Sequence, residues 1–122
     1  MADISPDADI NTETGSTTDS GFVEGVVESI LSRFGRLDYA VNCAGIIGPW
    51  ATSTELDMKD HDKVMDVNYR GTFLCSRAEI RAMLKNEPTG ADEIPGQRGA
   101  VVNIASGLGF VGRAGAREYC LS

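Results

Sequence analysis

A hydroxyl and a phenol near the end of the chain have the chemistry to bind and protonate one oxygen atom. Ser106 follows an apolar run at residues 100–104, and Tyr119 comes thirteen positions later, after a glycine-rich connection. An alkoxide that forms on a carbonyl carbon needs an acid within hydrogen-bond reach. A phenol, with an ordinary pKa of about 10, holds its proton at neutral pH and needs a nearby cation to act as a base. Taken singly, such a serine is most often a turn residue and such a tyrosine is most often a packing residue. A catalytic role for the pair therefore depends on the surrounding elements.

Two short strands and one long helix would position this pair. Residues 100–104 have the β-branched, apolar character of a buried strand, residues 37–42 are expected to form a second short strand, and residues 57–86 have helical periodicity. Strand, helix and strand in this order form a βαβ crossover with parallel strands. Ligands of open α/β sheets bind at the carboxyl ends of such strands. The sequence therefore predicts an incomplete α/β fold with Ser106 at a ligand-binding edge.

The helices are predicted from their apolar stripes and their ends. Asp19 or Ser20 is expected to cap a first helix that Gly35 ends. The long helix is apolar on two opposite sides, so it needs two partners, the sheet and a second subunit. One stripe consists of Val64, Val67, Gly71, Leu74, Cys75, Ala78 and Ala82, and the other of Tyr69, Phe73, Ile80 and Leu84.

Charge, apolar runs and cysteines indicate which partners and which location to expect for the protein. The formal charge is −7, but five acidic residues and no basic ones lie in the first twenty positions, so the rest is close to neutral. We expect residues 1–18 to be a disordered acidic tail and residues 19–122 to be the folded domain. No basic stripe favours a nucleic acid, and no run of roughly 20 apolar residues favours a membrane span. Three scattered cysteines indicate reduced thiols and a cytoplasmic protein.

The strand ends and the long helix carry motifs that resemble the short-chain dehydrogenase/reductase family. In that family a serine about thirteen residues before a Tyr-x-x-x-Lys motif activates the carbonyl or alcohol, as Ser106 and Tyr119 would here. The lysine would be the residue after Ser122. The glycine-rich strand, turn and helix that hold the cofactor pyrophosphate are not found at the start of the sequence. The resemblance covers about residues 20–122 and implies a partial doubly wound, Rossmann-type parallel sheet in three α/β/α layers.

The resemblance also implies roles for particular residues. The segment 42–45 matches the family's Asn-Asn-Ala-Gly, which lies beside the adenosine half of the cofactor, with Cys43 in place of an amide side chain. Asn68, within an Asp-Val-Asn-x-x-Gly sequence, matches an asparagine that kinks the helix and holds a water of a proton relay. The implied cofactor is NAD or NADP. The candidate catalytic residues are Ser106, Tyr119 and Asn68, and the candidate cofactor-binding residues are Asn42, Cys43, Ala44, Gly45 and Tyr119.

These features imply an oxidoreductase that interconverts a small alcohol and a ketone, as a homo-oligomer joined through the 57–86 helix. Without the lysine and the pyrophosphate turn, we expect the 122 residues alone to be inactive. One alternative is a non-catalytic product, either a truncated gene product or a fragment that associates with full-length relatives. A flavodoxin-like binding module is another, because a lone βαβ unit occurs in many α/β folds.

Other chemistry is less favoured. His61 lies in a charged helical turn, where a solvated face is expected before metal ligation, and we predict no metal site. A serine hydrolase is not supported, because the sequence lacks a Gly-x-Ser-x-Gly elbow. Asp3 is a weak candidate for the acidic residue that binds a cofactor ribose.

Overall fold

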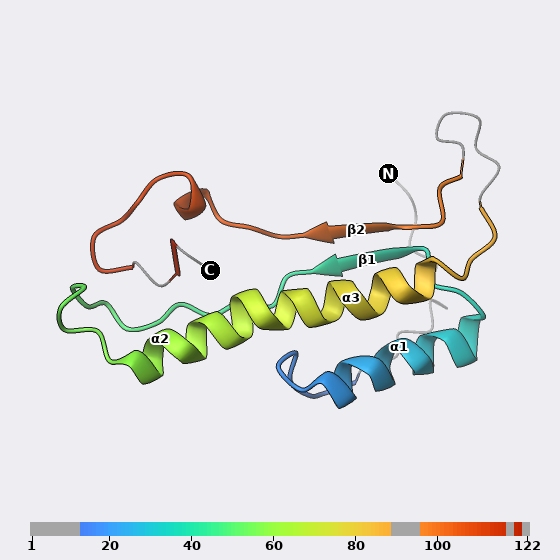
Figure 1. Ribbon diagram of the computed structural model, residues 1–122, viewed down its shortest axis with the longest axis horizontal. Coiled ribbons are helices and arrows are strands. Elements are labelled where there is room, and N and C mark those ends of the chain that lie inside the picture. The colour runs from blue at the N-terminus through green and yellow to red at the C-terminus, as the bar shows by residue number, and fades with distance from the viewer. Residues whose placement is uncertain (1–12, 89–95, 117–118, 121–122) are drawn as a thin grey trace, which may run out of the picture.

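The computed structural model describes residues 13–88, 96–116 and 119–120 (Figure 1). The two strands lie side by side in one sheet, and the helices run along it. The elements in chain order are α1 (Ser20–Phe34), β1 (Tyr39–Asn42), α2 (Met58–Met65), a π-helical segment (Asp66–Gly71), α3 (Thr72–Met83), β2 (Ala100–Asn103) and a 3₁₀ turn (Gly107–Gly109). Among these residues, no helix is both long and apolar enough to cross a membrane.

The ends of α1 are set by capping. The Asp19 carboxylate accepts hydrogen bonds from the N–H groups of Gly21 (2.8 Å) and Phe22 (3.3 Å). At the other end Gly35 has a φ of +76° and donates its N–H to the Leu31 carbonyl at 2.9 Å. A side-chain acceptor at the start and a left-handed glycine at the end are common helix signals. The predicted first helix is therefore confirmed at both ends.

The sheet confirms the predicted parallel crossover. Tyr39 pairs with Ala100 and Asn42 with Asn103. β1 begins two residues later than the predicted strand, because Leu37 turns into the core while the Asp38 carbonyl still accepts the Ala100 N–H at 2.9 Å. Both strands therefore point the same way and end at one edge, on the side where the long connections to α2 and to Tyr119 lie (Figure 1).

The core lies between the sheet and the helices. α3 contacts both strands, and α1 packs against α3. The predicted inner stripe of the long helix is buried or half-buried, with Val64 almost completely inaccessible. The central buried residues are Leu37, Ala82 and Met83, and Val27, Ile30, Leu31, Ala40 and Val101 pack against them. The described residues cover one face of the sheet with helices, and Tyr39, Val41, Val102 and Ile104 are exposed on the other. These residues thus provide two layers of the predicted incomplete three-layer arrangement.

The predicted tail divides into two parts. Residues 1–12 lie outside the described residues. Thr17 lies against the π-helical segment, where a Cβ on Gly71 would come within 2.7 Å of the Thr17 Oγ1 atom. Glycine at position 71 therefore allows this close approach. Disorder of residues 1–18 and a boundary at residue 19 stay predictions.

A buried asparagine joins the segments that precede the two strands. Asn86 is 7% exposed, and its Nδ2 donates to the carbonyls of Leu37 (2.7 Å) and Arg98 (2.8 Å). The Arg98 guanidinium in turn donates to the Asn86 carbonyl. One amide group thus holds the amino ends of both strands at the correct separation.

Replacing Asn86 with alanine should lower the free energy of unfolding by about 1–2 kcal/mol, because two largely buried carbonyls lose their donor. Urea denaturation followed by circular dichroism measures the change. Lys85→Ala, at the exposed neighbouring position, is the control and should cost less than about 0.5 kcal/mol. Equal costs for the two variants would contradict the structural role of Asn86.

Candidate functional site

A cavity of about 620 Å³ lies at the carboxyl ends of β1 and β2. Residues at and just after the strand ends, mainly 43–45 and 103–106, line one part of it. Tyr119 completes the cavity, and the π-helical segment and α3 line another part of it through Asn68, Tyr69, Thr72, Phe73 and Ser76. Carboxyl strand ends are the usual position of ligand sites in open α/β sheets.

The cavity brings together six of the seven residues singled out from the sequence. Ser106 and Tyr119, which come from opposite ends of the glycine-rich connection, both line it. The other four are Cys43, Ala44, Gly45 and Asn68. The seventh, Asn42, contributes to a hydrogen-bond network beside the cavity. The chemical role of each residue stays a prediction.

Ser106 is held at the end of β2 by the turn that follows it. Its backbone is extended, and its Oγ accepts the N–H of Leu108 at 3.2 Å, which caps the 3₁₀ turn. A hydroxyl has one donor hydrogen as well as two acceptor lone pairs. Capping the turn therefore fixes the Ser106 oxygen and leaves the hydrogen to donate to an acceptor in the cavity.

Asn68 connects the long helix to the loop after β1. Its Oδ1 accepts the Ile46 N–H at 2.8 Å, and its Nδ2 donates to the Ile46 carbonyl at 3.0 Å. The irregularity that the resemblance implied here is a π-helical segment, Asp66–Gly71, so the predicted single helix is three segments in one rod. The wider π turn changes the backbone pairing, and the Thr72 hydroxyl donates to the Asn68 carbonyl at 2.7 Å. Such π segments are frequent at functional sites.

A polar network links the two strand ends to α3. The Asn42 Nδ2 lies 2.9 Å from both the Glu79 Oε2 and the Asn103 Oδ1 atoms. The Ser76 hydroxyl donates to the same Asn103 oxygen at 3.2 Å. Sequence reasoning did not single out Ser76 or Asn103. Their signals were available, because Asn103 pairs with Asn42 in the sheet and Ser76 lies two helical turns after Asn68 on a similar face.

Three titratable side chains other than Tyr119 differ in environment. Burial, and to a smaller extent the Glu79 carboxylate, raises the pKa of the Cys75 thiol, which therefore stays protonated at neutral pH. Cys43 is exposed where it lines the cavity. His61 lies beside Asp62, with 3.2 Å between Nδ1 and Oδ1. The described part of the chain contains no cluster of three or more side chains suited to a metal ion.

Comparison with known proteins gives consistent matches. The family model described as short chain dehydrogenase matches residues 7–122. The 3beta-hydroxysteroid dehydrogenase of Mediterraneibacter gnavus is 36% identical over 100 residues, which are 82% of this chain and 32% of that protein. The 3-hydroxyacyl-CoA dehydrogenase type-2 of Homo sapiens is 39% identical over 95 residues, which are 74% of this chain and 35% of that protein. The chain thus spans about a third of the length of these curated relatives.

Solved structures agree on the fold. Levodione reductase matches with a TM-score of 0.82 and 32% identity, over 96% of this chain and 42% of that chain. A variant of ElxO with NADPH bound matches with a TM-score of 0.74 and 30% identity, over 88% of this chain and 39% of that chain. The two strands and the helices along them therefore have the arrangement found in the matching part of these proteins.

Proposed function

The chain belongs to the short-chain dehydrogenase/reductase family, and we propose that its residues form the substrate side of an NAD(P)-dependent oxidoreductase site. One observation supports this most directly. Ser106 and Tyr119, separated by a connection with an exposed middle, line one cavity together with Asn68 and the segment 43–45. The proposed substrate is a small molecule with an alcohol or a ketone group.

In the proposed mechanism, the two hydroxyl-bearing residues act on the substrate oxygen. Ser106 donates a hydrogen bond to it, using the hydrogen that its contact with Leu108 leaves available. Tyr119 holds a proton and delivers it to that oxygen as negative charge develops during reduction. In the oxidation direction Tyr119 accepts the proton from the alcohol. Asn68 holds the loop after β1 through Ile46, which keeps that loop in place beside the two hydroxyls.

The segment after β1 fits a nicotinamide cofactor. Ala44 and Gly45 are exposed and small, so a ligand is able to approach their backbone groups closely. A Cβ on Gly45 would lie 3.6 Å from the Asn68 Oδ1 atom, so a larger side chain would occupy the space between this segment and the helix. We propose that residues 43–45 hold the cofactor by their backbone and that Asn42 supports them from the network at the strand ends. When bound, NAD or NADP supplies or accepts the hydride.

A chimera tests the proposed function. Residues 20–122 replace the matching stretch of levodione reductase, and oxidation of NADH and NADPH is followed with a panel of ketones. We expect turnover from the chimera. We expect none from the 122 residues alone, which correspond to about a third of the curated relatives. A folded chimera that binds cofactor but reduces no ketone would contradict the proposal, with the parent enzyme as the positive control.

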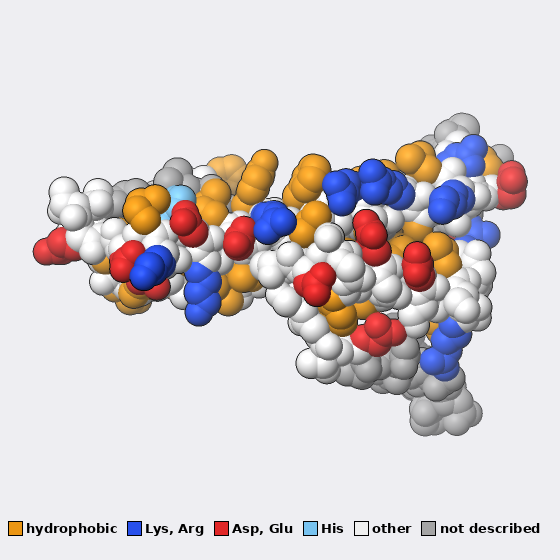
Figure 2. Space-filling view, turned by 60° about the horizontal axis from the view of Figure 1, so that its bottom comes forward, with side chains coloured by type: hydrophobic (Ala, Val, Ile, Leu, Met, Phe, Trp, Pro, Cys, Tyr) orange, Lys and Arg blue, Asp and Glu red, His pale blue; other side chains and the backbone are white. Residues whose placement is uncertain are grey.

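The exposed stripe of the long helix favours an additional role as an interface. Tyr69, Phe73, Ile80 and Leu84 are each about half exposed or more. Figure 2 shows hydrophobic side chains reaching the surface among interspersed acidic and basic ones. We propose that this stripe joins copies of the protein, or this chain to full-length relatives if the chain itself is non-catalytic.

We also propose a cytoplasmic location. The support for it is that Cys43, Cys75 and Cys120 are free thiols, which suit a reducing compartment.

Changing Phe73 and Ile80 together to glutamate should abolish self-association, because charges at a contact core are costly to desolvate. Size-exclusion chromatography with light scattering should show the mass of the associated protein fall to that of one chain. Phe34→Glu is the control, since Phe34 is an equally exposed phenylalanine on α1, outside the stripe. An unchanged mass for the double variant, or a monomeric parent protein, would rule out the interface.

A further inference from the structure

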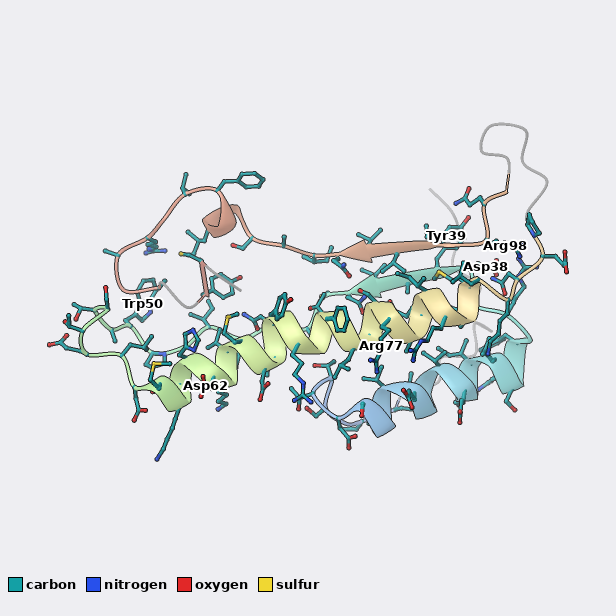
Figure 3. All side chains as sticks on the ribbon, in the orientation of Figure 1. Asp38, Tyr39, Trp50, Asp62, Arg77 and Arg98 are labelled. Atoms are coloured by element: carbon teal, nitrogen blue, oxygen red, sulfur yellow. The ribbon has the colours of Figure 1, made fainter. Side chains whose placement is uncertain are left out.

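Trp50 ties the loop after β1 to the connection between β2 and Tyr119. The Arg113 guanidinium carbon lies 4.8 Å from the centroid of the Trp50 ring. The ring also packs on the Gly115 backbone, where an added Cβ would lie 2.9 Å from the Trp50 Cε3 atom. Between the same segments, the Ala51 N–H donates to the Gly115 carbonyl at 3.2 Å. Figure 3 shows Trp50 between the loop that precedes α2 and the loop that follows β2.

This contact lies immediately before the turn that carries Tyr119. Gly115 has a φ of +82°, a conformation that favours glycine, and the next residue, Ala116, is 2% exposed. The Ala116 carbonyl then accepts the Cys120 N–H at 3.0 Å, which closes a helical turn around Tyr119. The turn is therefore anchored at its first residue, next to the Trp50 ring.

The rest of the connection offers little other support. Phe110 is 95% exposed, and Val111 is also exposed. Gly107, Gly109 and Gly112 have no atoms of other segments near the position of a Cβ. A segment with few buried contacts opens locally at low free energy. The contact at Gly115 is thus the main tertiary restraint on the connection between the 3₁₀ turn and Ala116.

We propose that Trp50 is a positioning residue, which sets the position of Tyr119 relative to Ser106 by packing on Gly115 and stacking on Arg113. The three partners are an aromatic face, a cation and a glycine backbone. The ring attracts the cation, and the missing side chain of the glycine leaves room for the ring. The inference rests on the proposed function only for the role of Tyr119. The coupling between the two loops is independent of turnover.

Trp50 is the only tryptophan, so the fluorescence of the full chain reports on this contact alone. Gly115→Ala places a Cβ against the ring and strains a positive φ. It should shift the emission to longer wavelength and raise the acrylamide quenching constant by about twofold as the ring becomes solvated. Gly112→Ala is the matched control, because that glycine has no neighbours and no positive φ, and it should leave both quantities unchanged.

Hydrogen exchange tests whether the contact restrains the turn. Trp50→Ala should speed exchange of the Cys120 amide by about tenfold, whereas Trp50→Phe, which keeps an aromatic face, should restore most of the protection. Arg113→Gln, which removes the cation, should also speed exchange of the Cys120 amide, but by a smaller factor. Arg113→Lys, which keeps a cation, should restore the slower exchange. Circular dichroism identifies any variant that fails to fold, and the Arg113 variants, which change an exposed side chain, then decide the question.

Two results would overturn the inference. One is a Gly115→Ala protein with the same fluorescence as the Gly112→Ala control. The other is unchanged exchange at Cys120 in a folded Trp50→Ala protein. An active chimera in which Trp50→Ala leaves exchange at Cys120 unchanged would reject the positioning role alone. An inactive chimera in which Trp50→Ala still speeds that exchange would reject the proposed function alone. In the active chimera, Trp50→Ala should lower kcat more than it changes KM, as expected when the acid moves and substrate binding is preserved.

Discussion

Phenylalanine at position 119 should lower kcat of the chimera by about 10²- to 10⁴-fold, because it removes the acid that protonates the substrate oxygen. The ring still fills its place in the cavity, so KM should change little. Steady-state oxidation of NADPH at saturating ketone measures the effect. Tyr39→Phe is the control, since Tyr39 is 75% exposed on the open face of the sheet and does not line the cavity.

The Tyr119→Phe variant also tests whether Ser106 could be the proton donor instead. If Ser106 alone were the proton donor, the phenylalanine variant would keep more than a tenth of the parent activity, and the assignment of Tyr119 would be wrong. A serine hydroxyl is a much weaker acid than a phenol, so we expect Ser106 to orient the oxygen and not to protonate it. A parallel loss of cofactor binding would indicate that Tyr119 also contacts the cofactor, which is the second role that the resemblance implies for it.

Alanine at position 68 should lower the free energy of unfolding by about 2–4 kcal/mol, because the N–H and the carbonyl of Ile46 both lose their partner. Each contact is short, 2.8 and 3.0 Å, and partly buried. Urea denaturation measures the loss, and hydrogen exchange should locate it at the Ile46 amide. The effect should exceed that of Asn86→Ala, because an unpaired N–H costs more than a carbonyl that has a second lone pair for water.

Two variants serve as controls for Asn68. Asn68→Asp keeps an acceptor for the Ile46 N–H but loses the donor to the Ile46 carbonyl, so its cost should be intermediate. Arg70→Ala removes an exposed side chain that pairs with Asp66 at 3.5 Å, and it should cost less than about 0.5 kcal/mol. If Asn68→Ala costs no more than Arg70→Ala, the bonds to Ile46 do not hold the loop.

The sequence was informative wherever the signal is local. The cap at Asp19 and the glycine at position 35 predicted the ends of α1, and both strands were predicted to within two residues. The inner apolar stripe of the long helix faces the core as predicted, whereas the outer stripe is exposed and its packing against a second subunit stays a prediction. The shared cavity of Ser106 and Tyr119 was expected from the family motif, which already specifies that these residues meet.

Features that depend on contacts between distant segments were not predictable. The family motif implied an irregularity at Asn68, but the apolar stripe continues through it at 100° per residue and gives no sign that the irregularity is a π-helical segment. The hydrogen bonds from the Asn42 amide to Glu79 and Asn103 were not predicted, and its place beside a cofactor stays a prediction. The contact of Trp50 with Gly115 joins two irregular loops, whose approach depends on the whole fold. Neither loop carries a periodic pattern that would indicate it.

The pairing of β1 with β2 also bears on the order of folding. Asn42 and Asn103 are neighbours in the sheet but are 61 positions apart in the chain. Closing so long a connection loses chain entropy before any strand hydrogen bond forms. The helical rod from Met58 to Met83 shortens the effective distance, and the buried contacts among α1, α3 and Leu37 hold one end of the connection. Docking of the helices is thus expected to precede strand pairing, so the cavity at the strand ends is among the last parts of the molecule to form.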